Sequence, residues 1–282
     1  MATVGTSDGL TLAVHDLGGP PTAPGLLLAH ATGFHGRMYQ PMVDAGLVER
    51  FRCFAPDLRG HGDSAATPAQ VSDWNRFGTD VLAVVDQLER QNARLYGFGH
   101  SMGGAALLMA ELLRPGTFAA LWLFEPIVAP PSSVSSEGPN PMAEAAARRR
   151  EVFESVAAAI ANYASKPPLD VFTPEAMAAY VEHGFASQPD GTVRLKCRGA
   201  VEAATYRGAG TQRTFDRLGE IACPVVVGVG APVSAGPSAF AAAAAAAMPH
   251  GSVERFEHLT HFAPQQAPAE LAGAVLNAFS RQ

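Results

Sequence analysis

The segment LYGFGHSMGG, residues 95–104, joins two apolar runs and contains the pattern G-x-S-x-G as Gly99, Ser101 and Gly103. A serine placed by this pattern between a strand and a helix stands on a sharp, strained turn with its hydroxyl exposed. The two glycines let neighbouring chain approach without a Cβ clash. The N-terminus of the following helix then directs N–H groups and a positive dipole end at the reacting oxygen. We therefore predict Ser101 as a nucleophile.

Short apolar runs alternate with helical patterns along most of the chain, which is typical of a βαβ architecture. Continuous apolar runs, rather than alternating ones, indicate strands that are buried on both faces of a parallel sheet. The expected strands are residues 10–16, 25–29, 51–55, 95–98, 119–124 and 225–229, followed by a last strand shortly before residue 256. The expected helices are residues 74–90, 102–113, 238–248 and 267–279. Together they predict an α/β fold with a mostly parallel central sheet flanked by helices.

One long segment breaks this alternation. Between Glu125 and Cys223 no buried strand pattern is present. Amphipathic helices are expected there at about 142–164, 174–186 and 199–206. We predict a core domain of residues 1–129 and 216–282, with residues 130–215 inserted as a helical lid. The alternative is that the segment forms a separate domain.

The segment FEHLTHFAP, residues 256–264, contains the candidate for a catalytic base. It follows the last expected strand and precedes the last expected helix, so a loop there can return a histidine to the nucleophile. The order serine first and histidine last fits this fold. We prefer His261, which precedes Phe-Ala-Pro, over His258.

Four segments together resemble the α/β-hydrolase superfamily: HATGF (30–34), APDLRGHGDS (55–64), the elbow at 99–103 and THFAP (260–264). The resemblance implies that the Met102 N–H is one oxyanion donor. It implies that the second donor is the Thr32 N–H, with Phe34 as the alternative. Ala31 stands where the family usually has glycine. Asp57 and Arg59 are expected to hold loops together rather than to do chemistry.

The acid of the expected triad is absent from its usual place in this family, which is after the strand at 225–229. No Asp or Glu lies between Glu220 and Glu254. Glu125 ends the adjacent strand, and some hydrolases of this superfamily carry their acid there. We therefore predict Glu125 as the acid that orients His261. In the alternative, Glu125 only caps the lid junction and Ser101 acts with His261 as a dyad.

Composition narrows the classes of partner. The 282 residues are 48% hydrophobic and 16% charged, with a net charge of −6, which indicates a globular protein and argues against a nucleic-acid partner. The basic cluster Arg148–Arg150 is interpreted as a solvated helix face rather than a phosphate site. Three scattered cysteines form no zinc or disulfide pattern. With no signal peptide and no spanning segment, we expect a cytoplasmic protein without a membrane partner.

The predicted function is a serine hydrolase that cleaves a small to medium hydrophobic ester or lactone without metal or cofactor. The residues expected to line its substrate pocket are His30, Phe34, His100, Phe153, Tyr163 and Tyr180. His30 and His100 are expected to pack or hydrogen-bond rather than act as bases. C–C hydrolysis, perhydrolysis, acyl transfer to an alcohol, or a non-hydrolytic binding module or pathway cyclase remain alternatives. The sequence does not decide between a monomer and a homodimer.

Overall fold

A computed structural model describes residues 1–88, 94–130, 140–233 and 236–280. Within these residues the main sheet has eight strands in the order β1-β2-β4-β3-β5-β6-β10-β11. From β4 onward neighbouring strands are parallel, whereas β2 is antiparallel to both β1 and β4. The strands are β1 (Ala2–Gly5), β2 (Thr11–Gly18), β3 (Gly25–Ala29), β4 (Arg52–Pro56), β5 (Leu95–His100), β6 (Leu121–Phe124), β10 (Val225–Val229) and β11 (Gly251–Arg255).

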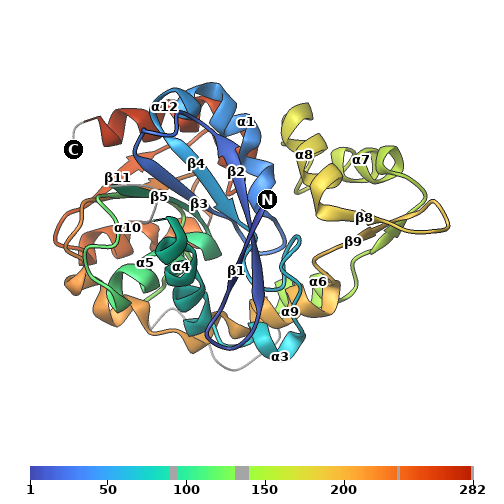
Figure 1. Ribbon diagram of the computed structural model, residues 1–282, viewed down its shortest axis with the longest axis horizontal. Helices are drawn as coiled ribbons and strands as arrows, with labels where there is room; N and C mark the ends of the chain where they lie inside the picture. The colour runs from blue at the N-terminus through green and yellow to red at the C-terminus, as the bar shows by residue number, and fades with distance from the viewer. Residues whose placement is uncertain (89–93, 131–139, 234–235, 281–282) are drawn as a thin grey trace.

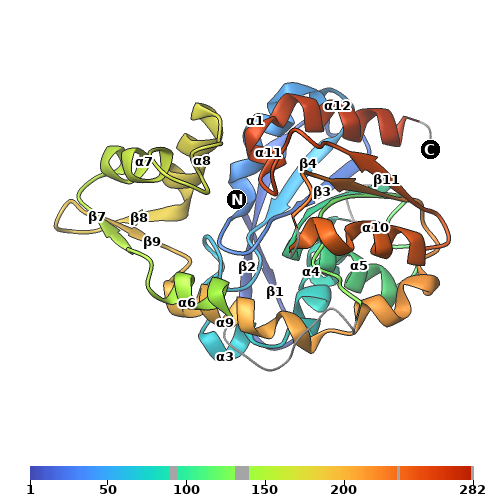
Figure 2. The same ribbon diagram turned by 180° about the vertical axis from the view of Figure 1, so that it is seen from behind.

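Helices cover both faces of this sheet (Figures 1 and 2). One apolar cluster joins α4, α5 and α10 to one face, and a second joins α1 and α12 to the other. Strands β3, β5 and β6 are therefore buried on both sides, as their continuous apolar runs predict. The helices of this core are α1 (Gln40–Met42), α2 (Val48–Arg50), α3 (Pro68–Val71), α4 (Asn75–Leu88), α5 (Met102–Leu113), α10 (Pro237–Ala247), α11 (Ala263–Gln266) and α12 (Pro268–Phe279).

The segment between β6 and β10 contains helices within each of the expected ranges and also a small sheet that the sequence did not predict. Residues 131–139 of the predicted lid, 130–215, lie outside the described residues. We call residues 140–215 the insert; much of it projects from one end of the molecule (Figures 1 and 2). Its strands β7, β8 and β9 pair antiparallel in the order β7-β9-β8. Its elements are α6 (Pro141–Ala147), β7 (Val152–Phe153), α7 (Val156–Ala164), α8 (Pro174–Gly184), β8 (Phe185–Ser187), β9 (Val193–Leu195) and α9 (Gly199–Gly208).

The prediction of one helix over 142–164 and of an all-helical insert is therefore wrong. Strand β7 separates α6 from α7, and it holds Phe153 against the two other short strands. Strands of two or three residues are too short to display the alternation by which a strand is recognised. The first β-strand, β1, was also not predicted, since three of its four residues are exposed.

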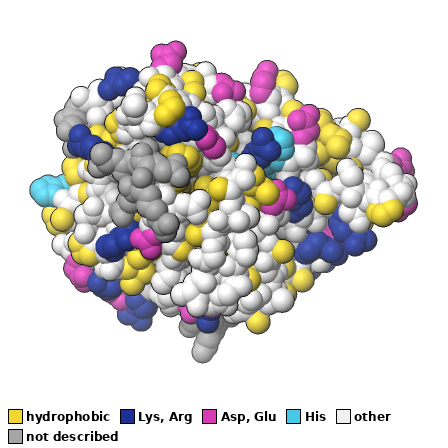
Figure 3. Space-filling view, viewed as in Figure 1, with side chains coloured by type: hydrophobic (Ala, Val, Ile, Leu, Met, Phe, Trp, Pro, Cys, Tyr) yellow, Lys and Arg dark blue, Asp and Glu magenta, His cyan; other side chains and the backbone are white. Residues whose placement is uncertain are grey.

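The surface carries charges of both signs. Figure 3 shows acidic and basic side chains scattered among apolar and neutral ones on the face it draws. Among the residues that the structure describes, no helix is long and apolar enough to cross a membrane.

Candidate active site

Ser101 occupies the turn between β5 and α5 in a strained conformation. Its φ of 56° and ψ of −117° lie in a region that residues with a Cβ rarely adopt. The Ser101 N–H donates to the carbonyl oxygen of Phe124 at 2.9 Å, and its own carbonyl accepts from Ile127 at 3.1 Å. These bonds to both sides of the end of β6 hold the turn in place. The backbone thus has the strained elbow that the sequence pattern predicts.

The elbow glycines allow β5, α5 and β3 to approach one another closely. A Cβ on Gly99 would lie 2.6 Å from the Cα of Gly104, and a Cβ on Gly103 would lie 2.1 Å from the carbonyl oxygen of Ala29. Both contacts are with backbone, which cannot move aside as a side chain can. The spacing G-x-S-x-G is therefore a packing requirement of this turn.

Glu125 is the second non-glycine residue with a positive φ among the described residues, at 43°. It follows β6 directly, and its side chain is 2% exposed. One carboxylate oxygen, Oε2, lies 2.6 Å from Nδ1 of His261. The other, Oε1, accepts the backbone N–H of Gly230 at 2.9 Å. The loop after β10, where the resemblance implies the usual place of the acid, thus binds the carboxylate of Glu125 through the Gly230 N–H.

The two C-terminal histidines lie in different surroundings. His261 contacts the buried Glu125, whereas His258 pairs with Glu270 at 3.1 Å and its side chain is 64% exposed. The structure places His258 on the surface. Of the two candidates for the base, His261 is the one held in the site.

His100, next to Ser101, fixes the backbone of His261. Its Nε2 lies 2.8 Å from the carbonyl oxygen of His261, so this nitrogen carries the hydrogen and Nδ1 accepts from the Tyr39 hydroxyl at 3.1 Å. Burial, and then the charge that His261 can carry, hold the pKa of His100 well below its ordinary value. His100 is therefore neutral and brings the loop of His261 against the end of β5.

The loop after β3 lies against the N-terminus of α5. The Thr32 hydroxyl donates to the sulfur of Met102 at 3.4 Å. The Phe34 N–H is already used by the carbonyl oxygen of Ala31 at 3.2 Å, which favours Thr32 of the two candidates for the second oxyanion donor. His30 bridges this loop to the next, because its Nδ1 donates to the Ala31 carbonyl and its Nε2 accepts from the Leu58 N–H, each at 2.8 Å.

A cavity of about 240 Å³ opens between this loop, the loop of His261 and the insert. Of the predicted pocket residues, Phe34, Tyr163 and Tyr180 line it. His30 and His100 do not, because both are fully buried in the hydrogen bonds given above, and Phe153 packs instead on Tyr163 and Phe185. The remaining lining residues are Thr32, Gly33, Met142, Ala145, Ala146, Arg149, Lys166, Pro167, Pro168, Leu169, Glu202, Tyr206 and Phe262.

The core and the elbow of this chain have counterparts in known proteins. The sequence pattern described as the alpha/beta hydrolase family matches residues 26–274. The chain belongs to the alpha/beta hydrolase family. Its members are generally hydrolytic enzymes.

Similarity in sequence to curated relatives of this alpha/beta hydrolase is confined to part of the chain. Human monoglyceride lipase is 35% identical over 105 residues, which cover 36% of this chain and 35% of the lipase. The magnesium-chelatase 30 kDa subunit of Rhodobacter capsulatus is 38% identical over 117 residues, which cover 38% of each chain. The chain thus spans little more than a third of the length of these relatives.

Solved structures match over nearly the whole length. E-2-(acetamidomethylene)succinate hydrolase superposes with a TM-score of 0.79 at 20% identity, covering 98% of this chain and 97% of that one. A thermophilic esterase from Thermogutta terrifontis superposes with a TM-score of 0.72 at 21% identity, covering 99% and 98%. At such identities the likeness concerns the alpha/beta hydrolase fold.

The basic cluster Arg148–Arg150 is not a uniformly solvated helix face. Arg148 is exposed, as expected, and Arg150 lies over the ring of Phe153 at 4.3 Å. Arg149 turns inward and lines the cavity with only 17% of its side chain exposed. The prediction failed for Arg149 because α6 ends at Ala147, so the three arginines do not share one helix face.

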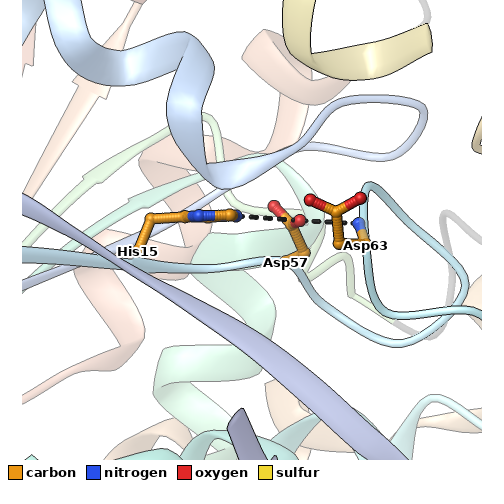
Figure 4. A group of neighbouring side chains, drawn as sticks. All are labelled: His15, Asp57 and Asp63. Carbon is orange, nitrogen blue, oxygen red and sulfur yellow. Dashed lines mark hydrogen bonds and ion pairs between the residues drawn. The ribbon is translucent and has the colours of Figure 1, made fainter. Parts of the chain in front are cut away.

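His15, Asp57 and Asp63 of this alpha/beta hydrolase are near enough to suggest a metal site, but the hydrogen bonds of Asp57 argue otherwise (Figure 4). Asp57 Oδ2 accepts from Nε2 of His15 at 3.0 Å and from the Asp63 N–H at 2.7 Å, and Oδ1 accepts from the Gly36 N–H at 2.7 Å. Three of the roughly four lone-pair sites of this carboxylate are therefore already used by donors. Asp57 thus ties its own loop and the loop of Gly36 to β2, as the sequence predicted.

Arg59 has the other loop-holding role that the sequence predicted. It is almost fully buried and pairs with Asp80 at 2.6 Å and with Asp8 at 3.0 Å. The cysteines are buried, and burial raises the pKa of Cys53 and of Cys223 to about 12. Neither thiol is suited to nucleophilic chemistry.

Acidification is expected to destabilise the protein before its carboxylates titrate. Burial lowers the pKa of His30 to about 3 and of His35 to about 4, and that of His100 also lies well below its ordinary value. Below the ordinary pKa of about 6.5 the unfolded chain binds protons that the folded chain does not. The free energy of unfolding therefore decreases as the pH is lowered. Each such histidine contributes up to about 1.4 kcal/mol per pH unit. Urea denaturation at pH 7, 6 and 5 measures this slope.

Asp57 acts in a lower pH range. Burial opposes its ionisation, but His15 outweighs burial and holds the pKa of Asp57 below its ordinary value. The stability that Asp57 contributes is therefore lost only below about pH 4.

His250 is exposed, so the variant His250→Gln should keep the wild-type slope. A free energy of unfolding that is constant from pH 7 to 5 would contradict the neutral state assigned to the buried histidines.

Proposed function

We propose that the protein is a serine hydrolase that cleaves a small to medium hydrophobic ester or lactone through an acyl-enzyme on Ser101. The observation that supports this most is the bond between Glu125 and His261, which lies beside the strained turn of Ser101. A buried carboxylate on Nδ1 keeps the hydrogen on that nitrogen and leaves Nε2 free to accept a proton. The base is then in the tautomer that a serine nucleophile needs.

The reaction follows from these roles. His261 Nε2 takes the hydroxyl proton while Ser101 Oγ attacks the carbonyl carbon, and the N–H groups of Met102 and Thr32 hold the resulting oxyanion. The tetrahedral intermediate collapses as the C–O bond to the alcohol breaks, and the alcohol leaves with the proton from His261. Water then attacks the acyl-enzyme by the same route and releases the acid. In a lactone the alcohol stays attached to the acyl chain.

The insert supplies the candidate pocket and acts, in this proposal, as a lid. Much of the cavity wall is apolar, with Phe34 from the loop after β3, Phe262 next to His261, and Met142, Ala145 and Leu169 from the insert. Such walls suit a hydrophobic acyl or alcohol group. Human monoglyceride lipase, a partial relative, is named as an enzyme of this general type.

A fluorophosphonate tests the proposal without knowledge of the substrate, because it reacts with an activated serine. Intact mass should show one adduct on the wild type and none on Ser101→Ala. The variant Ser280→Ala is the matched control, because Ser280 is exposed at the end of α12 and should label like the wild type. A folded wild type without an adduct would favour the non-hydrolytic binding module instead. Product analysis of esters and lactones then separates hydrolysis from acyl transfer.

A further inference from the structure

Arg149 is held inside the cavity by contacts to three helices of the insert. It lies just after α6, its Nη1 pairs with Glu202 of α9, and its Nη2 donates to the hydroxyl groups of Tyr163 at 3.1 Å and Tyr180 at 2.7 Å. Tyr163 belongs to α7 and Tyr180 to α8, which lie on the opposite side of the insert from α6 and α9 (Figures 1 and 2). A cation is thus fixed on the wall of an otherwise largely apolar cavity.

Several hydrogen-bond donors around Arg149 have no acceptor among the residues that the structure describes. Its three bonds leave the N–H of Nε and one N–H of Nη1 without a partner among the described residues. Tyr163 and Tyr180 each accept from Arg149, and their own O–H groups donate to no residue in the part of the chain that the structure describes. This leaves four donor hydrogens on three residues that line the cavity. A group with acceptors only, such as a carboxylate, complements them.

The charges of the residues that line the cavity also favour an anionic ligand. Two cations, Arg149 and Lys166, line the cavity with one anion, Glu202. Glu202 pairs with Arg149, while Lys166 contacts the neutral side-chain oxygen of Asn162 at 2.8 Å. The whole chain has a net charge of −6, so this local excess of positive charge runs against the protein average. An anionic group of the ligand would balance it.

We propose that Arg149, Tyr163 and Tyr180 form a subsite that binds a carboxylate. The substrate is then an ester that also carries a free carboxylate, which does not react. This inference rests on the proposed function, since it names the substrate class of the same site. The cavity also reaches Thr32 and Gly33 on one side and Phe262 on the other. The apolar walls hold the body of the substrate, and the subsite binds its anionic end.

Matched pairs of esters test the subsite. For the acyl side, mono-4-nitrophenyl succinate, glutarate and adipate are compared with their neutral terminal amides. For the alcohol side, 4-acetoxybenzoate is compared with 4-acetoxybenzamide. For at least one pair, wild-type kcat/KM should favour the carboxylate by about 10–100-fold, which is the range expected of a charge-assisted hydrogen-bonded pair. The substitution Arg149→Met should bring that ratio close to one.

Arg150→Met is the matched control, since the adjacent arginine stacks on Phe153 and is not among the lining residues of this cavity. It should keep the wild-type ratio. If Arg149→Met does not fold, Tyr163→Phe and Tyr180→Phe each remove one O–H donor and should lower the same ratio. Equal kcat/KM for every pair in the wild type, or an unchanged ratio in Arg149→Met, would overturn the proposal.

A binding measurement separates failure of the subsite from failure of the proposed function. Calorimetry with the Ser101→Ala variant compares the monoamides of succinate, glutarate and adipate with the corresponding diamides. Tighter binding of a monoamide supports the subsite even if no ester is hydrolysed and no fluorophosphonate adduct forms. If no monoamide binds more tightly than its diamide and no ester pair favours the carboxylate, the subsite is overturned, whatever the enzyme hydrolyses.

Discussion

Replacement of Glu125 by glutamine should lower kcat by about 10³–10⁴-fold, the loss seen when the acid of a serine triad becomes an amide. The carboxylate has two fixed neighbours, Nδ1 of His261 at 2.6 Å and the N–H of Gly230 at 2.9 Å. Both neighbours are donors when Nδ1 carries the hydrogen. A carboxylate accepts from both, which an amide cannot do.

Either orientation of the glutamine amide therefore has a cost. If its oxygen faces Gly230, its NH₂ group faces Nδ1 and favours the tautomer with hydrogen on Nε2, which cannot take a proton from Ser101. If its oxygen faces His261, the NH₂ group opposes the Gly230 N–H in a buried site, where an unpaired donor costs about 1–3 kcal/mol. The first orientation keeps the backbone donor paired, so we expect it to dominate and to inactivate the base.

Steady-state kinetics on an ester that the wild type hydrolyses measure this effect. Glu270→Gln is the matched control, because it makes the same change in the exposed Glu270–His258 pair and should leave kcat unchanged. A wild-type rate in Glu125→Gln would mean that Ser101 and His261 act as a dyad and that Glu125 only closes the junction before the insert.

The fold of the core could be predicted because its strands are buried on both faces. The apolar runs at 25–29, 95–98 and 225–229 can be identified from the local sequence alone. Each of them lies within a strand of the structure. Strand β1 is mostly exposed at the sheet edge, and β7 to β9 have two or three residues each. Their stability comes from pairing with chain that is distant in sequence, so no local pattern marks them.

The site residues likewise divide into those that a local sequence pattern marks and those that it does not. Ser101 and His261 carry local signals, the elbow and the loop before the last helix. The contact expected between Glu125 and His261 is present, and its catalytic role stays a prediction. Arg149 gave no such signal: it stands in an arginine triplet, and only the end of α6 and three partners from α7, α8 and α9 turn it inward.

The second large effect is expected at Gly103. A Cβ there would lie 2.1 Å from the carbonyl oxygen and 2.4 Å from the carbonyl carbon of Ala29, and 2.8 Å from the carbonyl oxygen of His30. These atoms belong to the end of β3, which is paired with β4 and β5 and cannot shift alone. Gly103→Ala should therefore lower the free energy of unfolding by about 3 kcal/mol or more, measured by urea denaturation.

Gly273→Ala is the matched control for this prediction. Gly273 also lies in a helix, α12, but a Cβ there meets no atom within 4 Å. The same substitution should then raise the free energy of unfolding by about 0.5–1 kcal/mol, since alanine favours the helix over glycine. Opposite signs at the two glycines would separate the close contact at the elbow from helix propensity. A stable Gly103→Ala would instead mean that α5 can move away from β3, and its kcat would then measure how strictly the nucleophile depends on that contact.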